Sequence, residues 1–127
     1  MMFRLVSVPM ALFFGWAAAM QLNDPDPTRW FLMYASVAGL AMLSATGRSA
    51  PRLALVLALV ALVWASAIVP ELWSHWGVRD LGAQMSASRP EVEFGREFVG
   101  LLILATYCAA AAYFAPRVSS VAAAVRV

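Results

Sequence analysis

Residues 53–69, LALVLALVALVWASAIV, decide the fold because they carry no charge and a single hydroxyl group. A helix needs about 20 predominantly apolar residues to cross the hydrocarbon core of a bilayer. Similar apolar runs lie at residues 3–22, 28–46 and 98–114. We therefore predict an all-α integral membrane four-helix bundle, with one transmembrane domain over residues 1–127 and spans near these four positions.

The composition excludes a soluble globular domain. The chain has 127 residues, of which 63% are hydrophobic and 13% are charged, and its mean hydropathy is +0.77. Its nine basic residues are all arginine and are scattered singly, so we expect a lipid bilayer as partner and no binding of nucleic acid. One cysteine and one histidine exclude an internal disulfide and any metal site that needs several imidazoles from one chain.

The charged residues alternate between the ends of the apolar runs. One side carries arginines and no acid: Arg4, Arg48, Arg52, Arg117 and Arg126. The other side carries the remaining arginines together with all seven acids of the chain. These acids are Asp24, Asp26, Glu71, Asp80, Glu91, Glu93 and Glu97. By the positive-inside rule, both termini are predicted to be cytoplasmic and the acids to lie outside. The preference for arginine and alanine suggests a GC-rich bacterium, so we expect a multi-pass protein of the bacterial inner membrane.

The first run also has features of a signal peptide, since Arg4 precedes an apolar stretch that ends in small residues at Ala17–Ala19. The run continues to Leu22, which is long enough to span a membrane. We therefore expect this segment to be retained.

Two local patterns predict how the helices pack. The short connection 47–52 predicts that the second and third spans form an antiparallel hairpin, and Pro70 with Glu71 is expected to end the third helix. Ala35 and Gly39 lie four residues apart, a spacing of small residues that lets another helix approach closely.

The first acidic cluster follows the first run and contains Asn23, Asp24 and Asp26 between prolines, with Trp30 and Tyr34 further on. A structural interpretation explains the prolines as a stiff turn, Asp26 as a helix N-cap and Trp30 as an interfacial anchor. It leaves Asn23, Asp24 and Tyr34 unexplained. The alternative is an oxygen-rich site for Ca²⁺, another hard cation or a polar ligand.

The second acidic cluster opens the last helix and consists of Glu91, Glu93, Arg96 and Glu97. Its acids suit a helix N-terminus, and Arg96 is expected to pair with Asp24 or Asp26 and so join the first span to the last. Glu97 directly precedes the apolar run, where a carboxylate is expensive unless it faces a partner.

Residues 71–92 are expected to form a loop that lies in the interface and includes His75 between two tryptophans. His75 is either an interfacial residue or a ligand. The candidate metal ligands are therefore Asp24, Asp26, Glu93, Glu97 and His75, and a divalent cation such as Ca²⁺ is the one cofactor considered.

Two of these segments together carry a family resemblance. Residues 21–27, QLNDPDP, are followed by Trp30 and Tyr34, and residues 93–100 read EFGREFVG. This combination resembles the transmembrane protein 220 family of small four-span proteins. The resemblance implies a four-helix membrane fold and no specific activity.

The function predicted from the sequence is that of a non-enzymatic accessory subunit of a larger membrane complex, with an outer acidic site for a cation or polar ligand. The alternative is a membrane-embedded enzyme that uses Asp24, Asp26, Glu93 or Glu97, with or without His75, on a lipid-borne substrate. A solute transporter is disfavoured because no predicted span has a charge near its middle.

Overall fold

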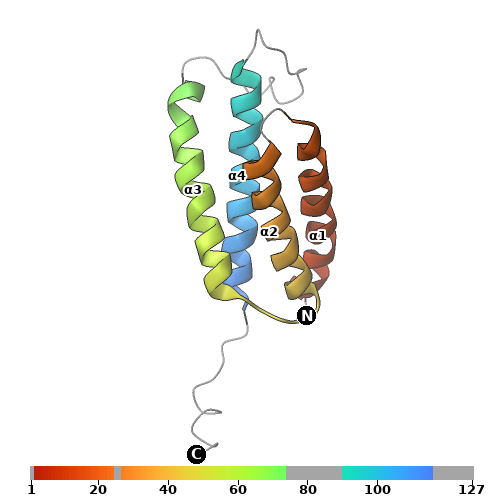
Figure 1. Ribbon diagram of the computed structural model, residues 1–127. Helices are drawn as coiled ribbons and strands as arrows, with labels where there is room; N and C mark the ends of the chain where they lie inside the picture. The colour runs from red at the N-terminus through yellow and green to blue at the C-terminus, as the bar shows by residue number, and fades with distance from the viewer. Residues whose placement is uncertain (1, 25–26, 74–89, 116–127) are drawn as a thin grey trace, which may run out of the picture.

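Four α-helices make up the bundle in the computed structural model, which describes residues 2–24, 27–73 and 90–115 (Figure 1). They are α1 (Met2–Met20), α2 (Pro27–Ala45), α3 (Pro51–Trp73) and α4 (Pro90–Tyr113), and a short 3₁₀-helix, η1 (Gln21–Asn23), follows α1. Successive helices run in opposite directions, so α2 and α4 point the same way. The predicted all-α, four-helix fold is confirmed for the described residues.

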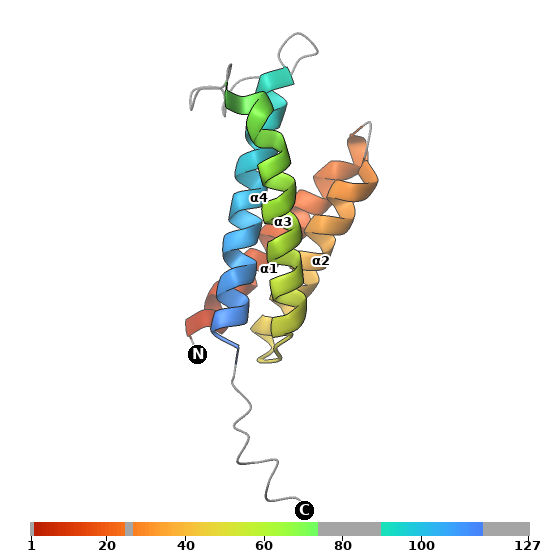
Figure 2. The same ribbon diagram turned by 90° about the vertical axis from the view of Figure 1, so that its left-hand side faces the viewer.

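Within the described residues, three stretches are long and apolar enough to cross a membrane: Met2–Asn23, Pro51–Trp73 and Glu93–Tyr113. Helix α2 is not among these, because its first turn holds Thr28 and Arg29 ahead of the apolar residues. It nevertheless packs along α1, and both views show the two helices side by side (Figure 2).

Large apolar side chains cover the outside of the bundle, as in a protein that contacts lipid. On α3, leucines and valines such as Leu55, Leu59 and Val63 are each more than half exposed. An exposed apolar surface of this extent is rare on soluble monomers and typical of a membrane-facing surface.

The helices pack in two close pairs, α1 with α2 and α3 with α4, while α2 meets α3 and α4 at fewer positions. The antiparallel direction of α2 and α3 is confirmed, and the two helices contact each other, although each packs more extensively on another helix. Helix α3 also continues beyond Pro70 to Trp73. Pro70 removes one backbone N–H, and this loss falls near the end of the helix, where the helix can tolerate it.

Small side chains hold α3 against α4. The buried face of α3 repeats alanine every three or four residues, at Ala54, Ala58, Ala61 and Ala65. Short side chains allow the two backbones to approach closely, which favours van der Waals contact between helices in lipid. The predicted role of Ala35 and Gly39 is wrong within the described chain, since no described atom of another element lies within 4 Å of a Cβ placed on Gly39.

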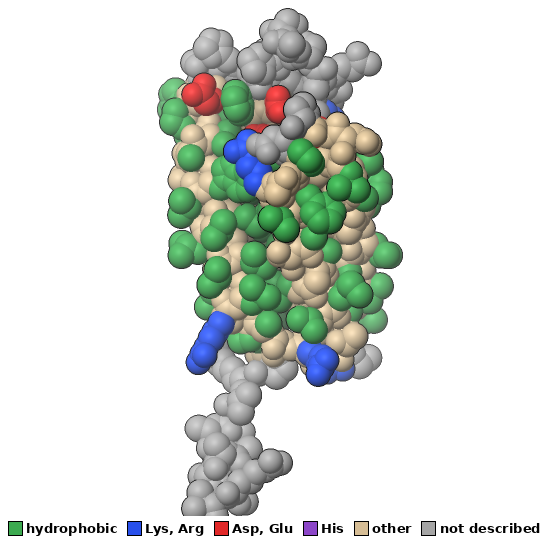
Figure 3. Space-filling view, viewed as in Figure 1, with side chains coloured by type: hydrophobic (Ala, Val, Ile, Leu, Met, Phe, Trp, Pro, Cys, Tyr) green, Lys and Arg blue, Asp and Glu red, His purple; other side chains and the backbone are tan. Residues whose placement is uncertain are grey.

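Charged side chains gather at the two ends of the bundle (Figure 3). We call one end the acidic end; the acids there whose side chains the structure describes are Asp24, Glu71, Glu93 and Glu97. The opposite end, the arginine end, carries Arg4, Arg48 and Arg52. The helix directions confirm that the two groups lie apart, while the assignment of the acidic end to the outside stays a prediction.

Candidate functional site

The turn between α1 and α2 presents Asp24 at the acidic end. The Asp24 N–H donates a hydrogen bond to the Gln21 carbonyl at 3.0 Å, which closes η1. Asp24 itself is extended, with φ −83° and ψ 155°, and its side chain is exposed. Helix α2 then begins at Pro27, where a proline costs no backbone hydrogen bond. Asp26, the predicted N-cap, lies outside the described residues.

Trp30 and Tyr34 lie one turn apart on α2, and both make contact with α4. The indole N–H of Trp30 donates a hydrogen bond to the Glu97 carboxylate. One turn further along, the Tyr34 hydroxyl oxygen lies 2.6 Å from where a Cβ on Gly100 would stand. Because α2 and α4 run in the same direction, residues 30 and 34 match residues 97 and 100 in order.

Aromatic rings fix Trp30 in this position. Its ring centroid lies 4.3 Å from that of Trp64 on α3 and 6.0 Å from that of Tyr34. The Tyr34 ring also lies 6.3 Å from Phe14 on α1. Rings from three helices therefore hold the indole that carries the hydrogen bond to Glu97.

Glu97 lies among charges of both signs. It is half-buried at the head of α4, and the charges of Glu93, Arg29 and Asp24 act on it. The Arg29 guanidinium carbon lies 5.4 Å from the centroid of the Trp64 ring, close enough for a cation–π interaction. Glu97 thus lies beside the Trp30 indole, within reach of the charges of two further carboxylates and one guanidinium.

The predicted pairing of Arg96 with Asp24 or Asp26 is not confirmed by the described contacts and stays a prediction. Arg96 is exposed, and Arg29 is the cation that acts on Glu97. The pairing of Arg96 with Asp26 involves a residue outside the described part of the chain. Sequence reasoning did not assign roles to Arg29 and Trp64, although Arg29 directly precedes Trp30 and Trp64 is the one tryptophan in residues 53–69.

The predicted metal site also stays a prediction. Within residues 2–24, 27–73 and 90–115, no group of three or more His, Cys, Asp or Glu side chains is arranged to hold a metal ion. Two of the predicted ligands, Asp26 and His75, lie outside these residues. Of the other predicted binding residues, Asn23, Asp24 and Glu93 are exposed, and Trp30 is buried.

An all-α bundle with apolar helices, an apolar outer surface and charges at its two ends is a small multi-pass membrane protein. Over residues 13–114 the sequence matches the family described as Transmembrane family 220, helix, and the chain belongs to this family. The resemblance predicted from residues 21–27 and 93–100 is therefore confirmed. No curated protein and no solved structure matches the chain.

Proposed function

We propose that this protein is a non-enzymatic accessory subunit of a larger complex in the bacterial inner membrane, and that it binds a cationic group at its outward-facing acidic end. The observation that supports this most is the position of Glu97. Trp30 holds its carboxylate in place, and Glu93 and Asp24 lie close enough to act on it.

The balance of charge favours a cationic ligand. Among the described residues, the charges that act on Glu97 are those of two further carboxylates, Glu93 and Asp24, and of one cation, Arg29, which also lies over the Trp64 ring. Carboxylates held near one another repel, and a bound cation relieves that repulsion. The ligand is either a divalent ion such as Ca²⁺ or a basic side chain of a partner protein.

The carboxylates of the site differ in burial. Glu97 is half-buried and hydrogen-bonded, so its position is set before a ligand arrives. Asp24 and Glu93 are exposed and accessible from outside the bundle. A fixed carboxylate beside two accessible ones reduces the ordering cost of binding.

Binding of a divalent ion is tested by measuring the thermal stability of the purified protein in uncharged detergent, with Ca²⁺ added at constant ionic strength. A ligand at a hundredfold excess over Kd stabilises the folded state by about 2.7 kcal/mol. We expect Ca²⁺ to raise the melting temperature of the wild type and to have little effect on Asp24→Asn with Glu93→Gln. The control is Glu71→Gln, an exposed acid at the same end on α3 that does not act on Glu97.

Binding of a partner protein is tested by the recovery of a stoichiometric complex from membranes in mild detergent. We expect the doubly neutral variant to lose the complex and Glu71→Gln to retain it. Binding of neither Ca²⁺ nor a partner, or equal binding by all three proteins, would contradict the proposal.

A further inference from the structure

Two adjoining cavities open at the arginine end, opposite the site described above. The larger has a volume of about 750 Å³ and lies between α1 and α4. The smaller, of about 400 Å³, is lined by Arg4, Arg48 and two serines. Phe3 and Phe114 line both cavities, and their rings stack with centroids 5.4 Å apart. An apolar cavity and a basic cavity therefore meet at one aromatic pair.

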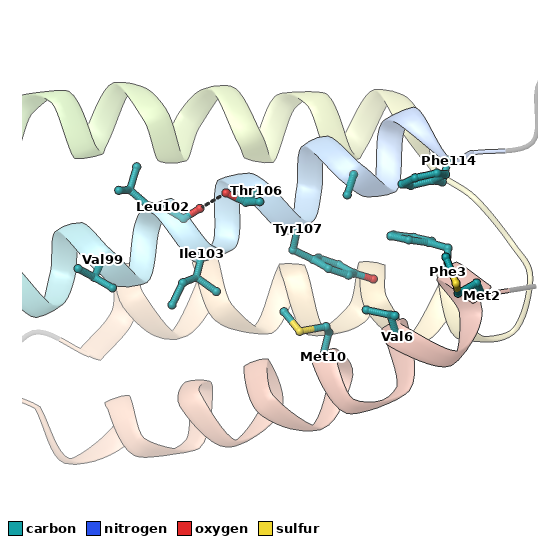
Figure 4. Close-up of a pocket in the computed structure, with 11 residues that line it drawn as sticks. Met2, Phe3, Val6, Met10, Val99, Leu102, Ile103, Thr106, Tyr107 and Phe114 are labelled. Carbon is teal, nitrogen blue, oxygen red and sulfur yellow. Dashed lines mark hydrogen bonds between the residues drawn. The ribbon is translucent and has the colours of Figure 1, made fainter.

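The larger cavity runs along α1 and α4 from the arginine end of the bundle (Figure 4). At 1.5 Å per residue, its wall extends about 12 Å along α1, from Met2 to Met10, and about 22 Å along α4, from Val99 to Phe114. The hydrocarbon of one leaflet is about 15 Å thick. On α4 the cavity therefore extends from the level of the arginines to the middle of the membrane and somewhat beyond it.

The polar groups beside the larger cavity are satisfied within the protein. The Thr106 hydroxyl donates to the Leu102 carbonyl at 2.7 Å. The Tyr107 hydroxyl donates to the Ser7 hydroxyl at 2.9 Å, and Ser7 donates to the Phe3 carbonyl at 2.9 Å. The wall therefore offers its occupant apolar contacts, which suit a hydrocarbon chain.

The smaller cavity is suited to an anion. Gly47 has φ +83°, and the Arg4 guanidinium lies directly against it, in the space that a side chain would occupy. This contact holds Arg4 at the turn that follows α2, where Arg48 is also exposed. None of the described residues that line this cavity is acidic, and Ser44 and Ser49 add hydroxyl groups.

We propose that a phospholipid with an anionic headgroup binds here, with its phosphate between Arg4 and Arg48 and one acyl chain in the larger cavity. Guanidinium groups form strong, charge-assisted hydrogen bonds with phosphate. The apolar cavity opens beside the headgroup level, so that one lipid fills both cavities. This site is separate from the acidic end and does not depend on its function.

The headgroup is tested by native mass spectrometry of the purified full-length protein with phosphatidylglycerol or phosphatidylcholine of identical chains. Each arginine near an anionic lipid favours binding by about fivefold, so we expect about a 25-fold preference for phosphatidylglycerol. Arg4→Gln with Arg48→Gln is expected to remove the preference and retain binding of both lipids. Arg52→Gln, which is exposed at the same end and lines neither cavity, is the control.

The acyl chain is tested by filling the larger cavity. Ala110→Phe, at a residue in its wall, is expected to weaken both lipids at least tenfold, whereas Ala109→Phe, at an exposed residue outside the wall, leaves binding unchanged. If the double arginine variant does not fold, Arg48→Gln alone replaces it. If Ala110→Phe does not fold, Val6→Trp replaces it. A preference that survives loss of the arginines, unchanged binding in the filled cavity, or full competition by soluble glycerol phosphate would overturn the proposal.

Discussion

At the scale of single residues, two contacts set the register of α2 against α4. Trp30 donates to Glu97, and one turn further on Tyr34 lies against Gly100. The first contact fixes a charged group and the second requires a residue without a side chain. Together these two contacts determine which face of α4 lies against α2 at the acidic end.

Gly100→Ala should be less favourable than the same change at Gly39. Alanine stabilises a helix by about 1 kcal/mol relative to glycine, so Gly39→Ala, which meets open space, should raise stability. At Gly100 the new methyl group would overlap the Tyr34 hydroxyl, and overpacking costs about 1–3 kcal/mol. The free energies of unfolding in detergent measure the difference.

A double variant shows whether the hydroxyl is responsible. Tyr34→Phe removes the atom nearest to Gly100, so it should reduce the cost of Gly100→Ala. Equal stabilisation by alanine at Gly39 and Gly100 would contradict the contact.

Trp30→Phe should destabilise the bundle because it removes the N–H that donates to Glu97. A hydrogen bond to a charged group contributes about 1.5–3 kcal/mol. Trp16→Phe is the matched control, since Trp16 is 63% exposed on α1. The loss of stability caused by Trp30→Phe should be smaller in a protein that already carries Glu97→Gln than in the wild type. Equal stability of the Trp16 and Trp30 variants would exclude a role for the indole N–H.

At the scale of helices, the face of α3 that packs on α4 depends on the small size of its alanines. Ala61→Leu places a larger side chain where the exposed fraction is 0%, and overpacking of this kind costs about 1–3 kcal/mol. Ala67→Leu adds the same side chain at an exposed position of α3 and should change stability little. Chemical unfolding in detergent compares them; a larger loss at Ala67 would place the interface on the wrong face.

The sequence predicts the helices better than their pairing. Apolar runs and prolines mark the elements, and α2 and α4 begin at Pro27 and Pro90. The pairing of helices depends on which small residues lie against another helix. Gly39 and the α3 alanines are all small residues within apolar runs, so the local sequence does not distinguish them. The predicted use of Gly39 is therefore wrong, since burial is decided by the whole bundle.

The same reasoning applies to the candidate site. The spacing of Trp30 and Tyr34 predicts a shared face, and Glu97 at the apolar boundary predicts a partner. The identity of that partner, the Trp30 indole, requires the register of α2 against α4. The role of Arg29 likewise follows from the position of Trp64 on another helix.

At the scale of the whole molecule, the two ends of the bundle have opposite character. The acidic end offers carboxylates beside fixed aromatic rings, and the arginine end offers a basic cavity that adjoins an apolar one. The proposed function requires that the acidic end faces the outside of the cell, as the arrangement of arginines predicts.

This orientation is measured most directly by labelling single cysteines in intact cells with a maleimide that does not cross membranes. Thr28→Cys is at the acidic end and Ser49→Cys at the arginine end, both at exposed positions, while the native Cys108 is fully buried. We predict that the Thr28 variant is labelled in intact cells and the Ser49 variant only after permeabilisation. The reverse pattern would place the acids in the cytoplasm and contradict the proposed outward-facing site.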